Sequence, residues 1–267
     1  MDVIQLLDTG YLYAKSPNRI FINTCLGCTG GCSYCYLPQI GYNNNSHSAP
    51  VRTASEILQD IQSSGYPISS KTLVTLGCFS ECWDDNNKPQ TIELIRHFLS
   101  QGNQVQLSTK KQIPLSDILP FQDLIQYQGQ LVIFVSSATI SKHQTIEHNT
   151  DSPDSRFKTF DISRHLDIPT VLYMKPILQG ITVQDIDLYR KVIQDYHIKD
   201  VVVGSIFKEH LTDETVPFSN KKQLFYNPVS DEIRIKNGLR DLCDIFSRST
   251  QVMNKYREKS LDLDYRY

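Results

Sequence analysis

Residues 19–37, RIFINTCLGCTGGCSYCYL, join a short apolar run to a loop rich in cysteine and glycine. The run, Arg19–Asn23, predicts a short buried strand because its residues are mostly apolar or β-branched. Four of the seven cysteines of the chain follow within eleven residues, at positions 25, 28, 32 and 35. In a cytosolic protein such clustering favours metal or redox chemistry over disulfides.

The rest of the chain repeats a strand followed by a helix. The predicted strands are Arg19–Asn23, Thr72–Leu76, Gln104–Ser108, Gln130–Val135, Thr170–Lys175 and Val201–Gly204. Helical patterns lie between them, at Ala54–Ser63, Thr91–Ser100, Leu115–Ile125, Ser155–Leu166 and Gln184–Tyr196. Six such units imply right-handed βαβ crossovers. We therefore predict an α/β fold with a partial (β/α)6 TIM-like barrel over residues 1–206, whose chemistry lies at the carboxyl ends of the strands.

The pattern changes after Phe207, and we expect a short C-terminal α/β extension over residues 207–267. Leu224–Pro228 and Glu232–Lys236 predict the two strands of a small hairpin. Gly238–Lys259 predicts a mostly polar helix, and Asp262–Tyr267 a tail.

Composition narrows the class of protein. Of the 267 residues, 40% are hydrophobic and 21% charged, which is typical of a soluble globular protein and unlike disordered, collagen-like or coiled-coil chains. The formal net charge of −2 argues against a protein that binds duplex nucleic acid along a basic stripe. The apolar runs are far shorter than the ~20 residues of a membrane helix, and Met1–Gln5 lacks the basic start of a signal peptide. We expect a cytoplasmic protein without membrane contact.

The spacing of three cysteines indicates the group that the loop holds. Cys28, Cys32 and Cys35 follow a C-x3-C-x2-C pattern. Three thiolates on one tight loop can bind three irons of a [4Fe–4S] cluster and leave the fourth iron open to another ligand. A four-cysteine zinc site separates its cysteine pairs by a longer loop. We therefore assign Cys28, Cys32 and Cys35 as metal ligands and expect Cys25 to be a buried, spare thiol.

The same pattern, with Tyr34 directly before Cys35, resembles the signature of the radical S-adenosylmethionine superfamily. Residues 31–37, GCSYCYL, are similar to the spore photoproduct lyase family, and the similarity extends over roughly residues 20–206. The resemblance implies a partial barrel, a [4Fe–4S] cluster and S-adenosylmethionine bound to its open iron. It further implies that one-electron reduction cleaves S-adenosylmethionine to methionine and a 5′-deoxyadenosyl radical, which abstracts a hydrogen atom from the substrate.

The resemblance also implies residues that contact S-adenosylmethionine, placed after the predicted strands. Thr109-Lys110 resembles a Thr-Lys pair whose lysine contacts the cofactor carboxylate, and Ser136 occupies the position of a serine that touches the cofactor. Glu147 and Arg156 reproduce a Glu–Arg spacing of nine, and residues 175–178 resemble a stretch that flanks the adenosine. The implied cofactor-binding set is Ser80, Glu81, Lys110, Ser136, Arg156 and Lys175. Taken singly, such residues also have ordinary structural explanations, for example a solvated charge or a strand-end cap.

A hydrogen donor is implied by residues 77–81, GCFSE, which resemble a Cys-Thr-Ser-Asp segment of the family. The cysteine of that segment returns a hydrogen atom to the product radical, a task suited to a weak S–H bond. We assign Cys78 as catalytic, with Tyr34 and Tyr36 matching two tyrosines of the same relay. The alternatives are that Cys78 is a small buried residue or that Cys82 takes the role.

Two substrate classes fit this chemistry. The resemblance extends to enzymes, such as spliceases, that act on ribosomally made precursor peptides by cleavage or rearrangement of C–C or backbone bonds and work with a separate leader-binding protein. We favour such a peptide substrate, because the compact, near-neutral chain with its tyrosine-rich C-terminus fits it. Repair of a DNA lesion, as in spore photoproduct lyase, is the alternative. Against it stand the 24 residues before Cys25, fewer than in that family. The resemblance also implies a basic hairpin that grips the duplex, whereas the predicted hairpin Leu224–Lys236 carries Asp231 and Glu232 among its few charges.

Further alternatives are a small nucleoside or sugar substrate and a non-catalytic iron–sulfur protein. In the catalytic case, an electron donor such as flavodoxin or ferredoxin is required.

Overall fold

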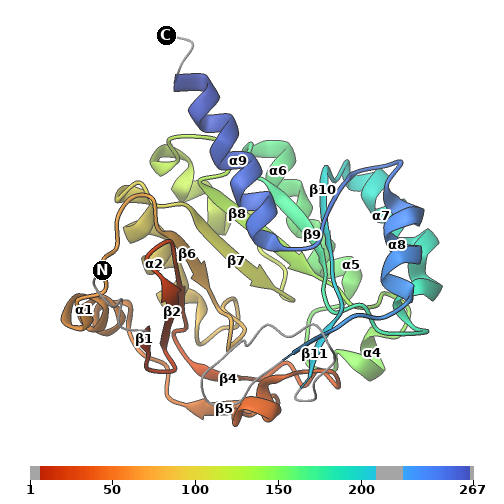
Figure 1. Ribbon diagram of the computed structural model, residues 1–267, viewed down its shortest axis with the longest axis horizontal. Coiled ribbons are helices and arrows are strands. Elements are labelled where there is room, and N and C mark those ends of the chain that lie inside the picture. The colour runs from red at the N-terminus through yellow and green to blue at the C-terminus, as the bar shows by residue number, and fades with distance from the viewer. Residues whose placement is uncertain (1–6, 209–224, 265–267) are drawn as a thin grey trace.

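The structure is a computed structural model that describes residues 7–208 and 225–264. Its centre is a nine-stranded sheet in the order β1-β2-β3-β6-β7-β8-β9-β10-β13 (Figure 1). Neighbouring strands from β3 to β13 run parallel, and β1 and β2 are antiparallel additions at one edge. The order begins at β1 and ends at β13, so the described strands form a partial barrel of the expected α/β class.

The sheet contains all six predicted parallel strands, and each of their ends lies within one residue of the expected position. The strands are β1 (Leu7–Asp8), β2 (Leu12–Ser16), β3 (Arg19–Ile22), β4 (Leu26–Cys28), β5 (Ser46–Ala49), β6 (Leu73–Leu76), β7 (Val105–Thr109), β8 (Leu131–Ser136), β9 (Thr170–Met174), β10 (Asp200–Val203), β11 (Ile206–Lys208), β12 (Phe225–Asn227) and β13 (Asp244–Phe246). The helices are η1 (Leu37–Ile40), α1 (Ala54–Ser64), α2 (Lys88–Ser100), α3 (Leu115–Ile118), η2 (Leu119–Leu124), α4 (His143–Ile146), α5 (Pro153–Arg156), η3 (Phe157–Phe160), α6 (Asp161–His165), η4 (Thr182–Asp185), α7 (Ile186–Tyr196), α8 (Asp231–Leu239) and α9 (Ser249–Asp264).

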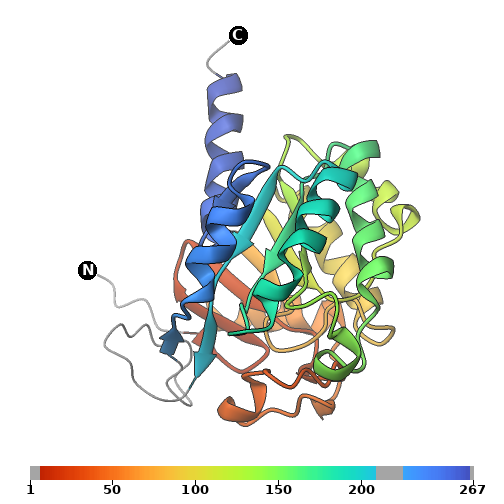
Figure 2. The same ribbon diagram turned by 90° about the vertical axis from the view of Figure 1, so that its right-hand side faces the viewer.

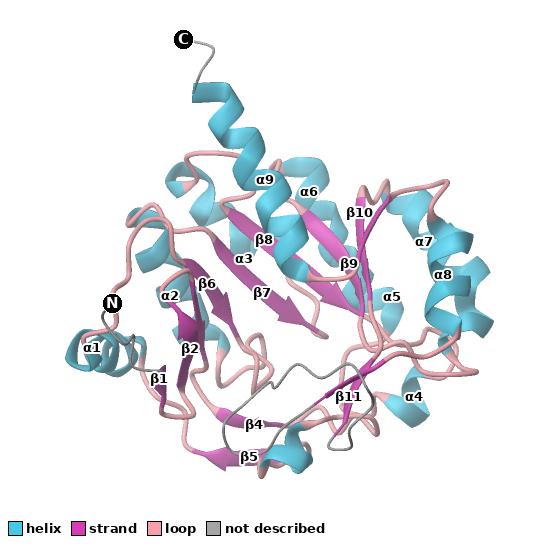
Figure 3. Ribbon diagram, in the orientation of Figure 1, coloured by secondary structure: helices cyan, strands magenta, loops and turns pink. Residues whose placement is uncertain are grey.

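The two faces of the sheet pack against different partners. Successive side chains of a strand point to opposite faces, so Ile133 of β8 belongs to the large core under the outer helices. Its neighbours Val132 and Phe134 point the other way and pack with Met253 and Tyr256 of α9. Figures 2 and 3 show the outer helices along one side of the sheet and α9 alone across the other. α9 therefore fills part of the barrel interior.

The helices that match the sequence pattern have clear end signals. Thr53 caps α1 in a capping box with Glu56, and Gly65 ends the helix in a left-handed conformation with φ of 66°. α2 begins three residues before the expected Thr91, with Pro89 in its first turn.

Two predicted helices are broken into short pieces. Pro120 lies where α3 gives way to η2 within the predicted helix Leu115–Ile125. The predicted helix Ser155–Leu166 is a succession of α5, η3 and α6. These turns connect strands without forming one continuous outer helix.

The C-terminal hairpin predicted from the sequence is wrong. β12 pairs with β11, and Glu232–Lys236 lies in α8. Glu232 and Lys236 form a 2.6 Å ion pair one helical turn apart, a spacing that stabilises a helix. Leu224, the first residue of the predicted hairpin, lies outside the described residues.

The single helix predicted over Gly238–Lys259 is also wrong. α8 ends at Leu239, β13 follows and pairs in parallel with β10, and α9 begins only at Ser249. Residues 262–264 of the predicted tail belong to α9, and 265–267 lie outside the described residues. The described C-terminal residues thus extend the main sheet and its interior packing. Within the described chain, no helix is both long and apolar enough to cross a bilayer.

Candidate functional site

The cysteine loop is held from two sides by backbone contacts. It begins at Cys28, the last residue of β4, whose amide donates to the carbonyl of Asn43 at 3.0 Å. On the opposite side, Cys32 forms an antiparallel bridge with Glu147. The amide of Asn149 donates to the carbonyl of Gly30 at 3.1 Å. Residues far away in the sequence therefore set the shape of the loop.

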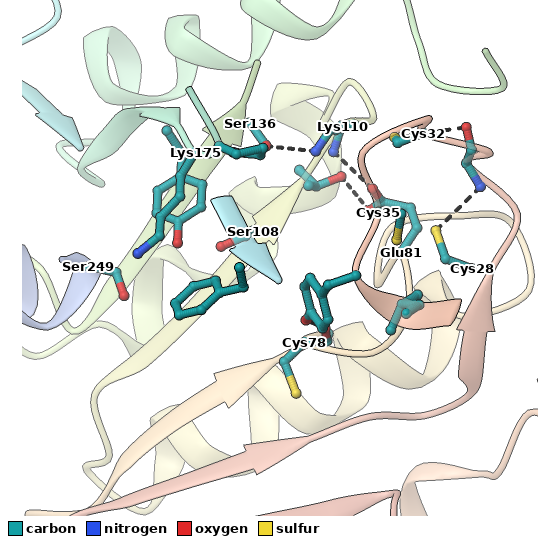
Figure 4. Close-up of a pocket in the computed structure, with 18 of the residues that line it drawn as sticks. Cys28, Cys32, Cys35, Cys78, Glu81, Ser108, Lys110, Ser136, Lys175 and Ser249 are labelled. Carbon is teal, nitrogen blue, oxygen red and sulfur yellow. Dashed lines mark hydrogen bonds between the residues drawn. The ribbon is translucent and has the colours of Figure 1, made fainter. Parts of the chain in front are cut away.

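The three predicted ligands, Cys28, Cys32 and Cys35, line one cavity of about 840 Å³ (Figure 4). All three are free thiols, and burial raises the pKa of each, that of Cys28 to about 12. The thiols need a strong local positive charge to bind as thiolates, and a metal centre supplies one. A Cβ added to Gly30 would lie 3.3 Å from Cys28 Sγ, so glycine allows the backbone to pass close to the thiols.

Among the described residues, no three cysteine, histidine or carboxylate side chains are grouped as ligands of one metal ion. A [4Fe–4S] cluster does not require such a group, because each thiolate binds a different iron. Three thiols of one glycine-containing loop, turned to a common cavity, fit the donor set of such a cluster.

The other cysteines of this region differ in their access to the cavity. Cys25 is fully buried, and its thiol donates to the carbonyl of Ala49 at 3.2 Å. Cys82 is also buried, and its thiol donates to the carbonyl of Ser108 at 3.6 Å. Cys78 lines the cavity, whereas Cys25 and Cys82 do not. The position of Cys78 at the cavity therefore favours Cys78 over Cys82 as a residue that contacts a bound ligand.

A lysine and a serine lie together at the ends of neighbouring strands. Lys110 follows β7, and its Nζ donates to Ser136 Oγ, at the end of β8, over 2.8 Å (Figure 4). The same Nζ is 3.9 Å from Glu147 Oε1. Burial alone would lower the pKa of Lys110, but the charges of Cys32 and Glu147 outweigh burial and raise it. Both side chains line the cavity, and a charged ammonium beside a hydroxyl suits a ligand carboxylate.

Arg156 lies behind this pair. It is fully buried and does not line the cavity, so its position does not fit the direct cofactor contact that the resemblance implies. Its Nη1 donates to Glu147 Oε2 at 2.7 Å and to the carbonyl of Ser136 at 2.8 Å. Burial alone would raise the pKa of Glu147, but Lys110 and Arg156 outweigh burial and lower it. Arg156 thus positions the carboxylate and the strand end that flank the cavity.

Two residues after β6 also reach the cavity. Glu81 Oε2 accepts a 2.8 Å hydrogen bond from the amide of Lys110, and Oε1 accepts one of 3.1 Å from the amide of Trp83. Burial raises the pKa of Glu81. The buried hydroxyl of Ser80 has no hydrogen-bond partner among the described residues. Because an unpaired buried hydroxyl is costly, Ser80 is suited to contact a polar ligand.

The predicted hydrogen donors divide into two groups. Asn23 Nδ2 lies 3.5 Å from Cys78 Sγ, and the hydroxyl of Tyr36 donates to the carbonyl of Cys78. Burial raises the pKa of Cys78 to about 12, so the sulfur keeps its hydrogen. Tyr34 instead donates to Glu147 beside the cysteine loop. The structure brings Tyr36 to Cys78 and Tyr34 to the Glu147–Arg156 pair.

Lys175 lies at another part of the cavity. Figure 4 shows its side chain extending towards Ser249 at the start of α9 and away from the three cysteines. Its Nζ lies 5.0 Å from the ring centre of Phe207 and 5.6 Å from that of Tyr226. The ammonium of Lys175 therefore points away from the cysteine loop, although β9 pairs with β8 near Ser136.

Solved structures of other proteins have a similar fold. A variant of spore photoproduct lyase matches with a TM-score of 0.63 at 14% identity, over 90% of this chain and 79% of that chain. Spore photoproduct lyase complexed with dinucleoside spore photoproduct gives 0.62 at 13% identity, over 90% and 80%. The chain has the spore photoproduct lyase fold. Streptococcus suis SuiB bound to S-adenosylmethionine gives 0.55 at 11% identity, over 87% of this chain and 51% of that chain.

No protein-family model matches the chain, and no curated protein matches it in sequence. The structural matches confirm the partial barrel that the cysteine pattern and the strand order predict.

Several residues of the site carry no signal in the sequence. The segment 146–149 holds the cysteine loop through its backbone. These backbone contacts could not be predicted from residue types, although Glu147 itself matches the family spacing. Arg19 and Gln106 line the cavity from the inner face of the sheet, and Ser249 from the start of α9. The alternation of side chains along β3 and β7 could have indicated Arg19 and Gln106, once the inner face was known.

Proposed function

We propose that the chain is a radical S-adenosylmethionine enzyme. The observation that carries this proposal is that Cys28, Cys32 and Cys35 line the same cavity as Lys110 and Ser136. The fold shared with spore photoproduct lyase supports it. A protein that only stores or transfers electrons has no need for a polar binding site beside its cluster.

The residues of the chain divide between two tasks in this proposal. Cys28, Cys32 and Cys35 hold the [4Fe–4S] cluster, and the ammonium of Lys110 with the hydroxyls of Ser80 and Ser136 binds the polar groups of S-adenosylmethionine. When bound, the cluster and S-adenosylmethionine together supply the 5′-deoxyadenosyl radical that abstracts hydrogen from the substrate.

Cys78 is proposed to donate a hydrogen atom to the substrate radical. Its S–H bond breaks and a C–H bond forms, and the sulfur radical left on Cys78 takes a hydrogen atom from a thiol reductant. Tyr36, whose hydroxyl contacts the backbone of Cys78, orients this residue. The proposal uses Cys78 because it faces the cavity while Cys82 does not.

The favoured substrate is a ribosomally made precursor peptide, presented by a separate leader-binding protein in the cytoplasm, with flavodoxin or ferredoxin as the electron donor. The near-neutral charge of the chain supports a peptide over a polyanion. Repair of a DNA lesion is the second candidate, because three of the matched spore photoproduct lyase structures contain dinucleoside spore photoproduct.

The decisive experiment is anaerobic reconstitution with iron and sulfide, reduction, and mass spectrometry of the products. We expect 5′-deoxyadenosine to form from S-adenosylmethionine, and an oligonucleotide bearing spore photoproduct to remain unrepaired. Repair of the lesion would establish the DNA alternative. If no 5′-deoxyadenosine forms although the cluster is fully loaded, the enzyme proposal fails.

Replacing Cys78 by alanine is expected to preserve 5′-deoxyadenosine formation and change the product. The variant still binds cluster and cofactor, but its substrate radical lacks the thiol hydrogen and is quenched by other routes. Product mass spectrometry in deuterated buffer measures the change, because an exchangeable thiol delivers deuterium to the product. Cys82→Ala is the matched control and should keep the normal product and its deuterium. The reverse pattern would move the donor to Cys82.

A further inference from the structure

The part of the cavity around Lys175 differs in chemistry from the part around the cysteines. We call it the floor and define it by Arg19, Gln106, Lys175, Arg248 and Ser249, all of which line the cavity. These residues come from β3, β7, the end of β9 and the start of α9. The mechanism proposed above uses none of them for S-adenosylmethionine or for the hydrogen donor.

The floor carries three positively charged side chains that have no ion-pair partner among the described residues. Arg19, Lys175 and Arg248 form no ion pair with a carboxylate of the residues described. Arg19 donates from Nε to Thr75 Oγ1 at 2.9 Å, and its guanidinium lies 4.3 Å from the ring centre of Phe21.

Aromatic rings hold the two inner cations in place. Lys175 lies over Phe207 and Tyr226, as Arg19 lies over Phe21. A ring face attracts a cation but leaves its charge available to an anion on the other side. Burial lowers the pKa of Lys175 to about 8, the charge of Glu232 opposes this shift, and the neighbouring charges of Arg248 and Arg19 act with burial. A bound anion would relieve both effects.

The two described acids that line the cavity, Glu81 and Glu232, form no ion pair with these cations. Glu81 is held by amides and a hydroxyl beside the cysteine loop. Glu232 is paired with Lys236 at 2.6 Å and accepts hydrogen bonds from Ser205 and Tyr226. The charge of Glu232 also acts on Lys175, but the three cations of the floor outnumber this one carboxylate, so an excess of positive charge remains.

An amide oxygen without a hydrogen-bond partner gives the floor a neutral acceptor as well. Gln106 is only 2% exposed, and its Nε2 lies 3.4 Å from Ser249 Oγ. Its Oε1 is buried and has no partner in the described chain. Since buried amide oxygens are normally paired, Gln106 is suited to a ligand that brings an N–H group.

The interior next to Ser249 is closed by packing. Val252, Met253 and Tyr256 of α9 are buried against the inner face of the sheet. These side chains close the interior on the side of the floor that lies next to α9.

We propose that the floor binds a carboxylate of the peptide substrate, from an aspartate or glutamate side chain or from the C-terminus, between Lys175 and Arg19. This inference rests on the proposed peptide-modifying function and names the group that the enzyme selects. Charge-assisted hydrogen bonds from lysine and arginine favour a carboxylate over a neutral amide of the same size. The rings around the floor favour an aromatic residue beside the acidic one.

The test measures binding of four small probes to the reconstituted enzyme by isothermal calorimetry. They are acetyl-tyrosyl-glutamate with an amidated C-terminus, acetyl-tyrosyl-glutamine with a free C-terminus, the same glutamine peptide amidated, and the dinucleotide thymidylyl-thymidine. We expect at least one of the two carboxylate peptides to bind about tenfold more tightly than the neutral peptide, and the one that does identifies the source of the carboxylate. Equal binding of all three peptides, or tighter binding of the dinucleotide, would overturn the proposal.

Variants assign the effect to the floor. Lys175→Met should weaken binding of the carboxylate peptide about tenfold and leave that of the neutral peptide unchanged, and Lys175→Arg should restore the preference. Arg19→Gln provides an independent second variant. Lys111→Met is the matched control, because Lys111 lines the cavity but is already paired with Asp151 at 3.2 Å. A loss of preference in Lys111→Met equal to that in Lys175→Met would contradict the assignment.

The binding readout separates this inference from the proposed function. Formation of 5′-deoxyadenosine without substrate tests the radical chemistry in the same preparation. If the enzyme forms 5′-deoxyadenosine but shows no preference for a carboxylate peptide, only the floor proposal is wrong. If the protein prefers carboxylate peptides but forms no 5′-deoxyadenosine, the binding site stands and the proposed radical function is wrong.

Discussion

Cys32→Ala is expected to abolish both the visible absorbance of the iron–sulfur cluster and formation of 5′-deoxyadenosine, whereas Cys25→Ala keeps both. Cys32 lines the cavity with Cys28 and Cys35, and a cluster held by three thiolates loses one of its anchors in the variant. Cys25 is seven residues away, and its thiol is turned to the carbonyl of Ala49. Each variant removes one cysteine sulfur from the same short segment. Comparing them therefore distinguishes a cysteine that binds the cluster from a neighbouring cysteine that does not.

Iron and sulfide analysis, together with the absorbance spectrum, measures cluster content independently of turnover. The expected effect on 5′-deoxyadenosine is complete loss in Cys32→Ala and less than about a twofold change in Cys25→Ala. Thermal unfolding of both apo proteins controls for misfolding. Full cluster content in Cys32→Ala, or its loss in Cys25→Ala alone, would show that a different set of cysteines binds the irons.

Much of the parallel sheet could be predicted because its strands are buried on both faces. β8 is the clearest case: Leu131–Ser136 is buried at every position, and such strands appear in the sequence as continuous apolar runs. The cysteine ligands could be predicted for a different reason, since their spacing lies within one loop and needs no long-range contact.

The secondary structure of the C-terminal part could not be predicted, because its strand is too short to show a pattern and its last helix has a mostly polar sequence. β13 has three residues that are only partly buried or exposed, too few for a strand pattern to emerge. Its pairing with β10 depends on residues more than 40 positions apart. α9 has a mostly polar sequence, and only its position inside the barrel makes Val252 and Met253 part of the core.

In the candidate site, too, features that depend on residues close in the sequence could be predicted, whereas features that depend on contacts between distant residues could not. Cys78 and Cys82 are equivalent in the sequence, and only the turn after β6 places one at the cavity and the other against Ser108. Arg156 matches a family spacing, but the chain folds it behind Glu147. The cations of the floor are unpaired because no described carboxylate lies within ion-pair distance of them. The sequence alone does not show which acids lie near a given cation.

Arg156→Met is expected to destabilise the protein by about 3–5 kcal/mol, because it leaves the carboxylate of Glu147 buried without its closest cationic partner. Both side chains are fully buried and 2.7 Å apart. For a chain of this size, ~1 kcal/mol lowers Tm by about 2–4 °C, so the variant should melt on the order of 10 °C lower. Arg164→Met removes an arginine from an exposed pair with Asp161 and should cost less than about 1 kcal/mol.

A second variant distinguishes an unpaired charge from lost packing. Replacing both partners, Glu147→Leu with Arg156→Met, should recover part of the stability lost in Arg156→Met, because the carboxylate that Arg156→Met leaves without its arginine is removed as well. The recovery is only partial because Lys110, whose Nζ lies 3.9 Å from Glu147 Oε1, loses this partner. Hydrogen exchange of residues 28–35 should still be faster than in the wild type in both variants, since Glu147 bridges Cys32 and Arg156 holds the segment that contacts the loop. If the double variant is as unstable as Arg156→Met, the arginine acts through its bonds to the carbonyls of Ser136 and Asp151. Unchanged exchange in the loop would show that the backbone contacts of residues 146–149 persist without the ion pair.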